Sequence, residues 1–168
     1  EAEPLAAGQT ATLTYTIQVA DTHGGSTTQN VVVTIHGTND AATITASATE
    51  DTSVTEAGAG NATTAATPGD ATAGGTLTVH DVDAGQAHFA AVAPAALAGT
   101  YGNFSFDSAT GVWGYTLDNS KAATEALNAG DTQTDTLTVS SLDGTASQTI
   151  TVTIHGTNDA ATITATAT

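Results

Sequence analysis

Apolar and polar residues alternate with a period of two along much of this chain, which is the pattern of β-strands that bury one face. The clearest runs cover residues 13–19, 31–35, 137–139 and 150–154. The segments DTHGGSTT and LDGTAS separate the members of each pair and are rich in residues that favour turns. Each pair of runs is therefore predicted to form a β-hairpin.

A long stretch, VTIHGTNDAATITA, occurs twice without a single change, at 33–46 and at 152–165. The second copy begins 119 residues after the first (152 − 33), and such a repeat indicates duplicated modules. VTIH and ATITA alternate like strands, whereas GTND contains residues that tolerate tight turns. The GTNDA segment is therefore predicted to be the junction between successive modules.

This period divides the chain into three parts. Residues 1–40 are predicted to be the C-terminal part of a preceding repeat, because their hairpin matches the one at 137–154. Residues 41–160 are predicted to form one complete β-sandwich repeat, and 161–168 the first strand of the next. The chain is therefore expected to be a piece of a longer array.

The predicted complete repeat contains several further short strands, separated by Gly-rich turns, which together predict an all-β sandwich. Residues 57–75 have few bulky side chains and are predicted to form a long loop. Residues 119–127 (NSKAATEAL) are the one candidate for a short helical turn. Another hairpin, NFSF-DSATG-VWGYTL, concentrates the large apolar residues that should anchor the core: Phe104, Phe106, Trp113, Tyr115 and Leu117.

The chain is strongly acidic, with a formal net charge of −16 from 17 carboxylates and a single cationic side chain, Lys121. Phosphate binding requires Lys and Arg, so nucleic acid and anionic membrane surfaces are excluded as partners. A surface this acidic repels itself, and bound cations would relieve the repulsion. The chain has no cysteine for disulfides or thiolate metal sites, and no apolar run long enough for membrane insertion. These features predict a soluble, extracellular all-β protein.

Four segments together resemble a known family: GTLTVHDVDAG (75–85), YGNFSFDSATGVWGYTLDN (101–119), ALNAGDTQTDTLTV (126–139) and ITVTIHGTNDA (150–160). They resemble the VCBS repeat family of large bacterial surface proteins. The resemblance implies a cadherin- or immunoglobulin-like sandwich in an RTX-type adhesin that is exported by type I secretion and serves in cell adhesion and biofilm formation. It also implies Ca²⁺ near the junctions. The chain has Ala41–Ala42 where Ala-Pro is more common, which should leave the linker less stiff without ions.

Oxygen-bearing side chains near the junction are the candidate ligands for Ca²⁺, a hard cation that takes six to eight oxygens. Asn39 and Asp40 lie in the linker itself. Asp81 and Asp83 lie one residue apart at a strand end, so their side chains share a face. Glu56 ends a short strand and is expected at the same end of the sandwich. Such a cluster resembles the inter-domain sites of cadherins.

The alternative interpretation is ordinary turn chemistry, because Asn and Asp both favour turns and satisfy their own backbone. Glu50 and Asp51 are weaker candidates for the same end of the sandwich. Asp107, in the DSATG hairpin, is assigned to turn geometry alone.

The five histidines do not suggest a transition-metal site. His36 and His155 end predicted strands and have no second histidine near them in the sequence, and His80 should point to the opposite face from Asp81. Nothing in the chain indicates catalysis. Asp118 and Asp131 flank the candidate helical turn and are interpreted as cap or turn residues.

Lys121 raises the separate question of a covalent cross-link, because some surface sandwiches join a lysine to Asn or Asp. Such bonds need a buried lysine on a strand. Lys121 belongs to a polar segment, so its side chain is predicted to be solvated.

The sequence therefore predicts a non-enzymatic extender repeat whose partners are neighbouring repeats of the same chain and whose junctions Ca²⁺ stiffens. One alternative is a carbohydrate- or protein-binding module that uses loops 57–75 and 93–100, although these loops lack the Trp, Tyr and Arg of binding hot spots. A second alternative is an accessory domain of a secreted hydrolase. A further expectation is head-to-tail self-association, in which the tail at 160–168 pairs with the hairpin of another molecule, since exposed strand edges recruit partners.

Overall fold

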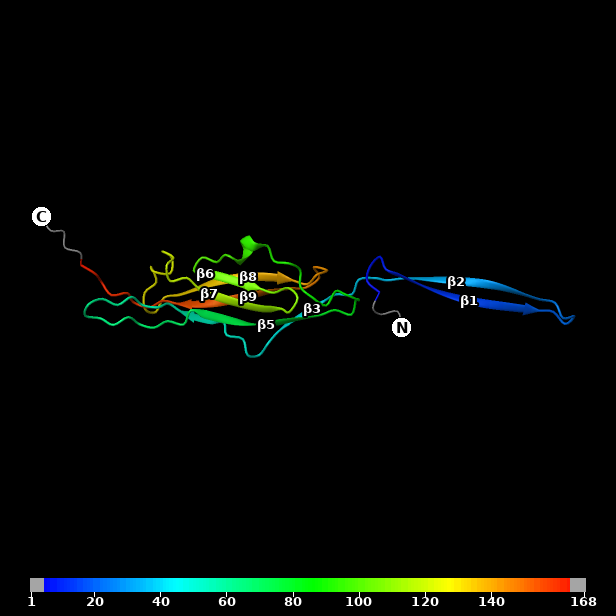
Figure 1. The fold of residues 1–168 in the computed structure, drawn as a ribbon, viewed down its shortest axis with the longest axis horizontal. Helices are drawn as coiled ribbons and strands as arrows, with labels where there is room; N and C mark the ends of the chain where they lie inside the picture. Colours follow the sequence, from blue (N-terminus) through cyan, green and yellow to red (C-terminus); the bar gives the residue numbers. More distant parts are fainter. Residues whose placement is uncertain (1–4, 164–168) are drawn as a thin grey trace.

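The structure is a computed structural model that describes residues 5–163, and its regular secondary structure is almost entirely β-strand (Figure 1). A two-stranded sheet precedes a four-stranded sheet of order β3-β5-β7-β6 and a three-stranded sheet of order β4-β9-β8. The strands are β1 (Thr10–Ala20), β2 (Ser26–His36), β3 (Thr43–Ala46), β4 (Ser53–Thr55), β5 (Thr72–His80), β6 (Gly102–Phe106), β7 (Val112–Leu117), β8 (Thr132–Ser140) and β9 (Ser147–His155). The predicted all-β class is confirmed.

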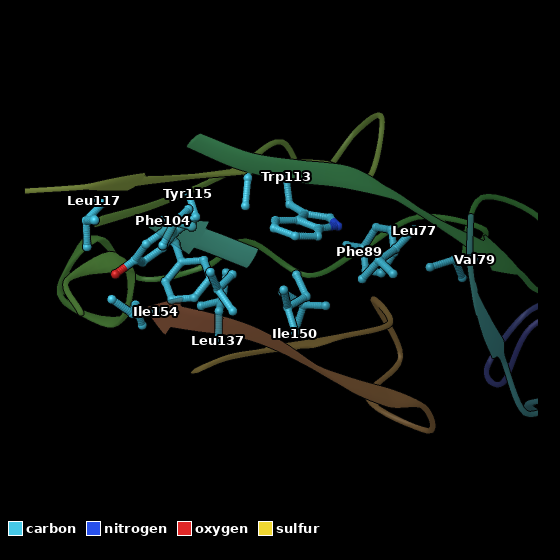
Figure 2. Close-up of a cluster of buried hydrophobic side chains, with 14 of the residues drawn as sticks. Leu77, Val79, Phe89, Phe104, Trp113, Tyr115, Leu117, Leu137, Ile150 and Ile154 are labelled. Atoms are coloured by element: carbon cyan, nitrogen blue, oxygen red, sulfur yellow. The ribbon is translucent and has the colours of Figure 1, made fainter. Parts of the chain in front are cut away.

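The two larger sheets pack face to face as a β-sandwich. Alternate residues of β5, β7, β8 and β9 point inward, as the period of two predicts, and form one continuous core (Figure 2). All pairings are antiparallel except that of β4, which runs parallel to β9 with Val54 opposite Ile154. The chain therefore changes sheets between β3 and β4, and this switch decides where the residues after β4 lie.

The aromatic hairpin of β6 and β7 anchors the core, as predicted. Trp113 and Tyr115 are each only 2% exposed, and each large side chain buried in this way contributes about 1.5–3 kcal/mol. The rings of Phe104 and Tyr115 meet edge to face at 4.8 Å, and those of Phe89 and Phe106 do so at 5.0 Å. Both distances lie within the favoured range for aromatic pairs.

Two local predictions were met only in part. The predicted loop 57–75 ends earlier, because β5 already begins at Thr72. Residues 119–127 form successive hydrogen-bonded turns, one of which joins the Glu125 N–H to the Lys121 carbonyl. The regular helical segment is a 3-10 helix at Pro94–Leu97 instead. Among residues 5–163, no helix is long and apolar enough to cross a membrane.

A buried carboxylate and a half-buried lysine hold the loop before β6 in place, and neither role was predicted. Asp135 is 5% exposed and accepts hydrogen bonds from the N–H groups of residues 100–102 and from the Tyr115 hydroxyl. Burial and the contact with Asp135 raise the pKa of the Tyr115 hydroxyl well above its ordinary value. Lys121 Nζ donates to the Gly99 and Gly102 carbonyls at 2.7 and 3.1 Å. Its side chain is therefore bound to the loop and not solvated.

The hairpin of β1 and β2 lies beyond one end of the sandwich (Figure 1) and leaves its apolar face open. Val33 and Ile35 of β2 are 44% and 37% exposed. Val152 and Ile154, which occupy the same positions of the duplicated stretch in β9, are both 0% exposed. Within residues 5–163, no hydrogen bond joins residues 10–36 to the sandwich. The division into repeats stays a prediction.

The expected self-association through the tail also stays a prediction, but the pairings inside the sandwich favour a different partner strand. Thr162 and Ile163 are the last described residues of the tail, and residues 164–168 lie outside the described part. Their counterparts in the first copy belong to β3, which pairs with β5. The hairpin contains only the counterparts of β8 and β9, and the open edge of β9 is filled by β4. A strand of the β4 type therefore suits the edge of β2 better than the tail does.

Deleting residues 1–37 should leave the sandwich almost as stable as in the full chain, because the hairpin shares no hydrogen bond with it. We expect the melting temperature, followed by the fluorescence of Trp113, to change by less than about 2 °C, which corresponds to well under 1 kcal/mol. Binding of an apolar dye should fall severalfold, since the open face is removed. A fall of more than about 5 °C in melting temperature would mean that the hairpin supports the core.

Candidate functional site

The end of the sandwich that faces the hairpin carries two acidic side chains with unpaired oxygens. Asp81 and Asp83 come directly after β5, and Asp83 is only 2% exposed. Asp81 Oδ1 accepts from the Asp83 N–H, and Asp83 Oδ2 accepts from the Asp40 N–H, both at 2.8 Å. The other oxygens, Asp81 Oδ2 and Asp83 Oδ1, are buried and have no hydrogen-bond partner. The structure thus brings the predicted residues Asp40, Asp81 and Asp83 together at this end.

The remaining predicted ligand of the linker, Asn39, lies beside them and points to a residue that sequence reasoning missed. Its Nδ2 donates to the Asp40 carbonyl at 2.8 Å and to Asp143 Oδ2 at 2.9 Å. Asp143 lies in the turn between β8 and β9 and also accepts from the hydroxyls of Ser141 and Thr145. These three donors hold the pKa of the Asp143 carboxyl well below its usual range. The sequence does show an aspartate in the LDGTAS turn, but it does not show that this turn lies beside the linker, because that placement depends on the packing of the two sheets.

Glu56 lies at the opposite end of the sandwich, so its predicted position beside Asp81 and Asp83 was wrong. Because β4 runs parallel to β9, Glu56 arrives where β9 ends and the second GTND segment begins. Its Oε2 accepts from the Thr157 N–H at 2.9 Å, and its carbonyl accepts from the Thr157 hydroxyl at 3.1 Å. Glu56 is 0% exposed, and its Oε1 has no partner.

The electrostatic environment of Glu56 opposes its charge. Burial raises the pKa of its carboxyl above the ordinary value, the Thr157 N–H bond partly offsets this, and the nearby charges of Asp159 and Glu125 add to the rise. A buried carboxylate without a counter-charge is costly. A bound cation at Oε1 would remove this cost.

Glu50 and Asp51 lie along the side of the sandwich and at neither end, so their expected placement was also wrong. Glu50 Oε1 accepts from the indole N–H of Trp113 at 3.1 Å. Asp51 exchanges backbone hydrogen bonds with Gly74, near the start of β5. Both residues are occupied in holding the segment between β3 and β4 to the sheet.

The carboxylates assigned to turns are found in turns. Asp107 Oδ1 accepts from the N–H groups of Ala109 and Thr110, and these contacts lower the pKa of its carboxyl. Asp118 accepts from Ser120, and Asp131 closes a turn with Asn128. Unlike Asp83 and Glu56, these side chains have no buried oxygen without a partner.

Each end of the sandwich therefore carries its own set of oxygen-bearing side chains, and each set lies beside one copy of the duplicated linker. One set consists of the linker pair Asn39–Asp40 with Asp81 and Asp83. The other consists of Glu56 with Asn158–Asp159. No group of three acidic or histidine side chains within residues 5–163 forms a finished metal site, but the buried unpaired oxygens fit a hard cation.

Comparisons of this chain with protein families, with curated proteins and with solved structures found no match.

Replacing Glu56 by Gln should stabilise the folded protein in EDTA at pH 7, by about 1 kcal/mol. The raised pKa means that folding favours the protonated carboxyl, so the charged form destabilises the fold above the folded-state pKa. The advantage of the variant should vanish as the pH falls below the unfolded-state value, where wild-type Glu56 is protonated in both states. Denaturant unfolding from pH 7 to 4 measures the difference.

The comparison variant is Glu125→Gln, which removes a neighbouring exposed charge that only adds to the rise in the Glu56 pKa. It should give a smaller gain in stability than Glu56→Gln at pH 7, because burial of Glu56 is the larger cause. A pH-independent difference between wild type and the Glu56 variant would contradict this assignment.

Proposed function

We propose that this chain is a non-enzymatic extender module of a bacterial surface adhesin, in which Ca²⁺ ions stiffen the junctions between successive sandwiches. The observation that carries the proposal is the presence of buried, unpaired carboxylate oxygens at both ends of the sandwich, each beside a copy of the same GTND linker. Native proteins seldom leave such groups unsatisfied.

The duplicated linker supports a composite site shared by two modules. Glu56 contacts Thr157 of the second copy, and Thr38 is the identical position of the first. A preceding module with its own glutamate at that position would bring a buried carboxylate to the Asn39–Asp40 linker. There it would join Asp81 and Asp83 of the following module. Three carboxylate sources and the linker oxygens together approach the six to eight ligands that Ca²⁺ takes.

The net charge of −16 would make the angle between neighbouring sandwiches depend on bound cations. Without cations, acidic ends of neighbouring sandwiches repel each other, and the Ala41–Ala42 linker has no proline to keep it extended. Cations held between the ends would replace repulsion by attraction and fix the angle between modules. A stiff array of such modules would hold a distal binding domain away from the cell, in keeping with the resemblance to VCBS repeats and with an extracellular location.

Melting experiments with Ca²⁺ and with EDTA test the proposal directly. The dissociation constant for Ca²⁺ is expected to be roughly 0.1–1 mM, as in other extracellular modules. Because the ion binds only the folded state, a Ca²⁺ concentration of 100 times that constant should raise the free energy of unfolding by about 2.7 kcal/mol. Mg²⁺ should substitute poorly because it demands strict octahedral geometry.

Asp83→Asn keeps an acceptor for the Asp40 amide and should abolish most of the gain, whereas Asp107→Asn should preserve it. Identical melting curves in EDTA and in several millimolar Ca²⁺ would refute the proposal.

A tandem chain tests whether the site is shared. Residues 1–165 followed directly by residues 47–168 join two sandwiches without a foreign sequence, because 33–46 and 152–165 are identical. Calorimetry should reveal a new Ca²⁺ site at least about tenfold tighter than any in the single chain, since more carboxylates raise affinity.

The tandem contains its own control. Glu56→Gln in the first sandwich should weaken the new site, because that glutamate faces the shared junction. The same substitution in the second sandwich should leave it unchanged. Equal effects of the two substitutions would show that Glu56 does not serve the junction.

A further inference from the structure

The duplicated linker adopts two different sets of contacts, although its sequence is the same at both places. The side-chain amide of Asn39 donates to the Asp40 carbonyl, and that of Asn158 donates in the same way to Asp159, at 2.8 and 3.0 Å. Asn39 makes a second bond, to Asp143. Within residues 5–163, Asn158 has no second partner of this kind. The difference comes from the sandwich that the first linker contacts and not from the linker itself.

Three bonds tie the first linker to the sandwich on its C-terminal side. Asp143 Oδ2 accepts from Asn39 Nδ2 at 2.9 Å, Thr145 Oγ1 accepts from the Ala42 N–H at 2.8 Å, and Asp83 Oδ2 accepts from the Asp40 N–H at 2.8 Å. The first two acceptors belong to the turn between β8 and β9, and they also bond each other, since the Thr145 hydroxyl donates to Asp143 at 2.6 Å. None of these contacts requires an ion.

We propose that Asp143 and Thr145 form a cation-independent latch, which orders the linker against the adjoining sandwich before any cation binds. Asp143 is a positioning residue in this scheme, because both of its oxygens are already used by Ser141, Thr145 and Asn39. Both N–H groups of the Asn39 amide are used as well, so its oxygen is the atom left to face a cation. The ordering effect stands on the linker geometry alone, whereas its consequence for cation affinity rests on the proposed function.

The charge distribution explains why a latch is useful here. Asp40, Asp81, Asp83 and Asp143 all lie at this end, and the one lysine of the chain, Lys121, is bound to the loop before β6. Neutral donors, namely an amide and two hydroxyls, satisfy the lone pairs of Asp143 without adding charge. The linker can therefore be held close to acidic groups in the absence of calcium, and less conformational entropy is lost when an ion binds.

Amide hydrogen exchange by NMR tests the latch in the full chain in EDTA, with the second linker as an internal reference. Neighbouring residues are identical, so intrinsic exchange rates match. The amides of Asp40 and Ala42 should exchange at least about tenfold more slowly than those of Asp159 and Ala161. Equal rates in the two linkers would overturn the proposal.

Variants separate the latch from a general loss of structure. Thr145→Val removes the acceptor of the Ala42 amide and should bring its exchange rate close to that of Ala161, whereas Thr145→Ser keeps the hydroxyl and should retain the protection. Asp143→Ala should have the same effect as Thr145→Val. Asp107→Ala, in another turn, should have none. Loss of protection in Thr145→Ser, or its retention in Thr145→Val, would refute the assignment.

Calcium titration of the same variants distinguishes the latch from the proposed function. Thr145→Val should weaken Ca²⁺ binding severalfold without changing the number of ions bound, since the ligands remain. Unchanged affinity in a variant whose linker has lost protection would refute the positioning role. If the wild type binds no Ca²⁺ but the two linkers still differ in exchange, the proposed function fails and the latch stands.

Discussion

The structure depends above all on one apolar contact, the closure of the inner face of β8 and β9 against β5 and β7. Val152 and Ile154 are completely buried in it and belong to the same core cluster as Tyr115. This closure fixes the direction of every strand, and strand direction fixes which residues lie at each end. The end of β5 and the β8–β9 turn meet the first linker, whereas the end of β4 meets the second. The candidate ligands thus owe their grouping to hydrophobic burial and not to any attraction among themselves.

Buried carboxylates in this molecule fall into two kinds, and the contrast between them identifies the candidate site. Asp135 is satisfied by four donors and serves to hold a loop. Asp83 and Glu56 are buried to a similar degree but keep one oxygen without any donor. A fold selected for stability alone would satisfy or replace such groups, because each costs about 1–3 kcal/mol. Their retention beside both linkers is the observation on which we base the proposal of a cation site shared between modules.

The linker illustrates how far identical sequences can differ in structure. The internal bond of the GTND asparagine to the next carbonyl occurs in both copies, because residues next to each other in the chain form it. The contacts to Asp83, Asp143 and Thr145 occur only at the copy that leads into the sandwich. In an array built from such units, the stiffness of each junction would therefore depend on both adjoining sandwiches. Neutral hydrogen bonds would supply part of that stiffness, and bound ions the rest.

The sequence by itself determined the local features: the period-two strands, both hairpins of the duplicated pattern, the aromatic core and the turn role of Asp107. Each depends on residues close together in the chain, where alternation and turn propensity act directly. Only the tertiary structure decided that Glu56 lies at the far end, that Asp143 holds the linker, and that Lys121 binds a loop. It also decided that Val33 is exposed while the identical Val152 is buried. These outcomes depend on which strand pairs with which. The sequence pattern does not specify the pairing, because apolar and polar residues alternate in the same way in a strand of either sheet. Pairing is chosen by the burial of the whole core, which no single segment encodes.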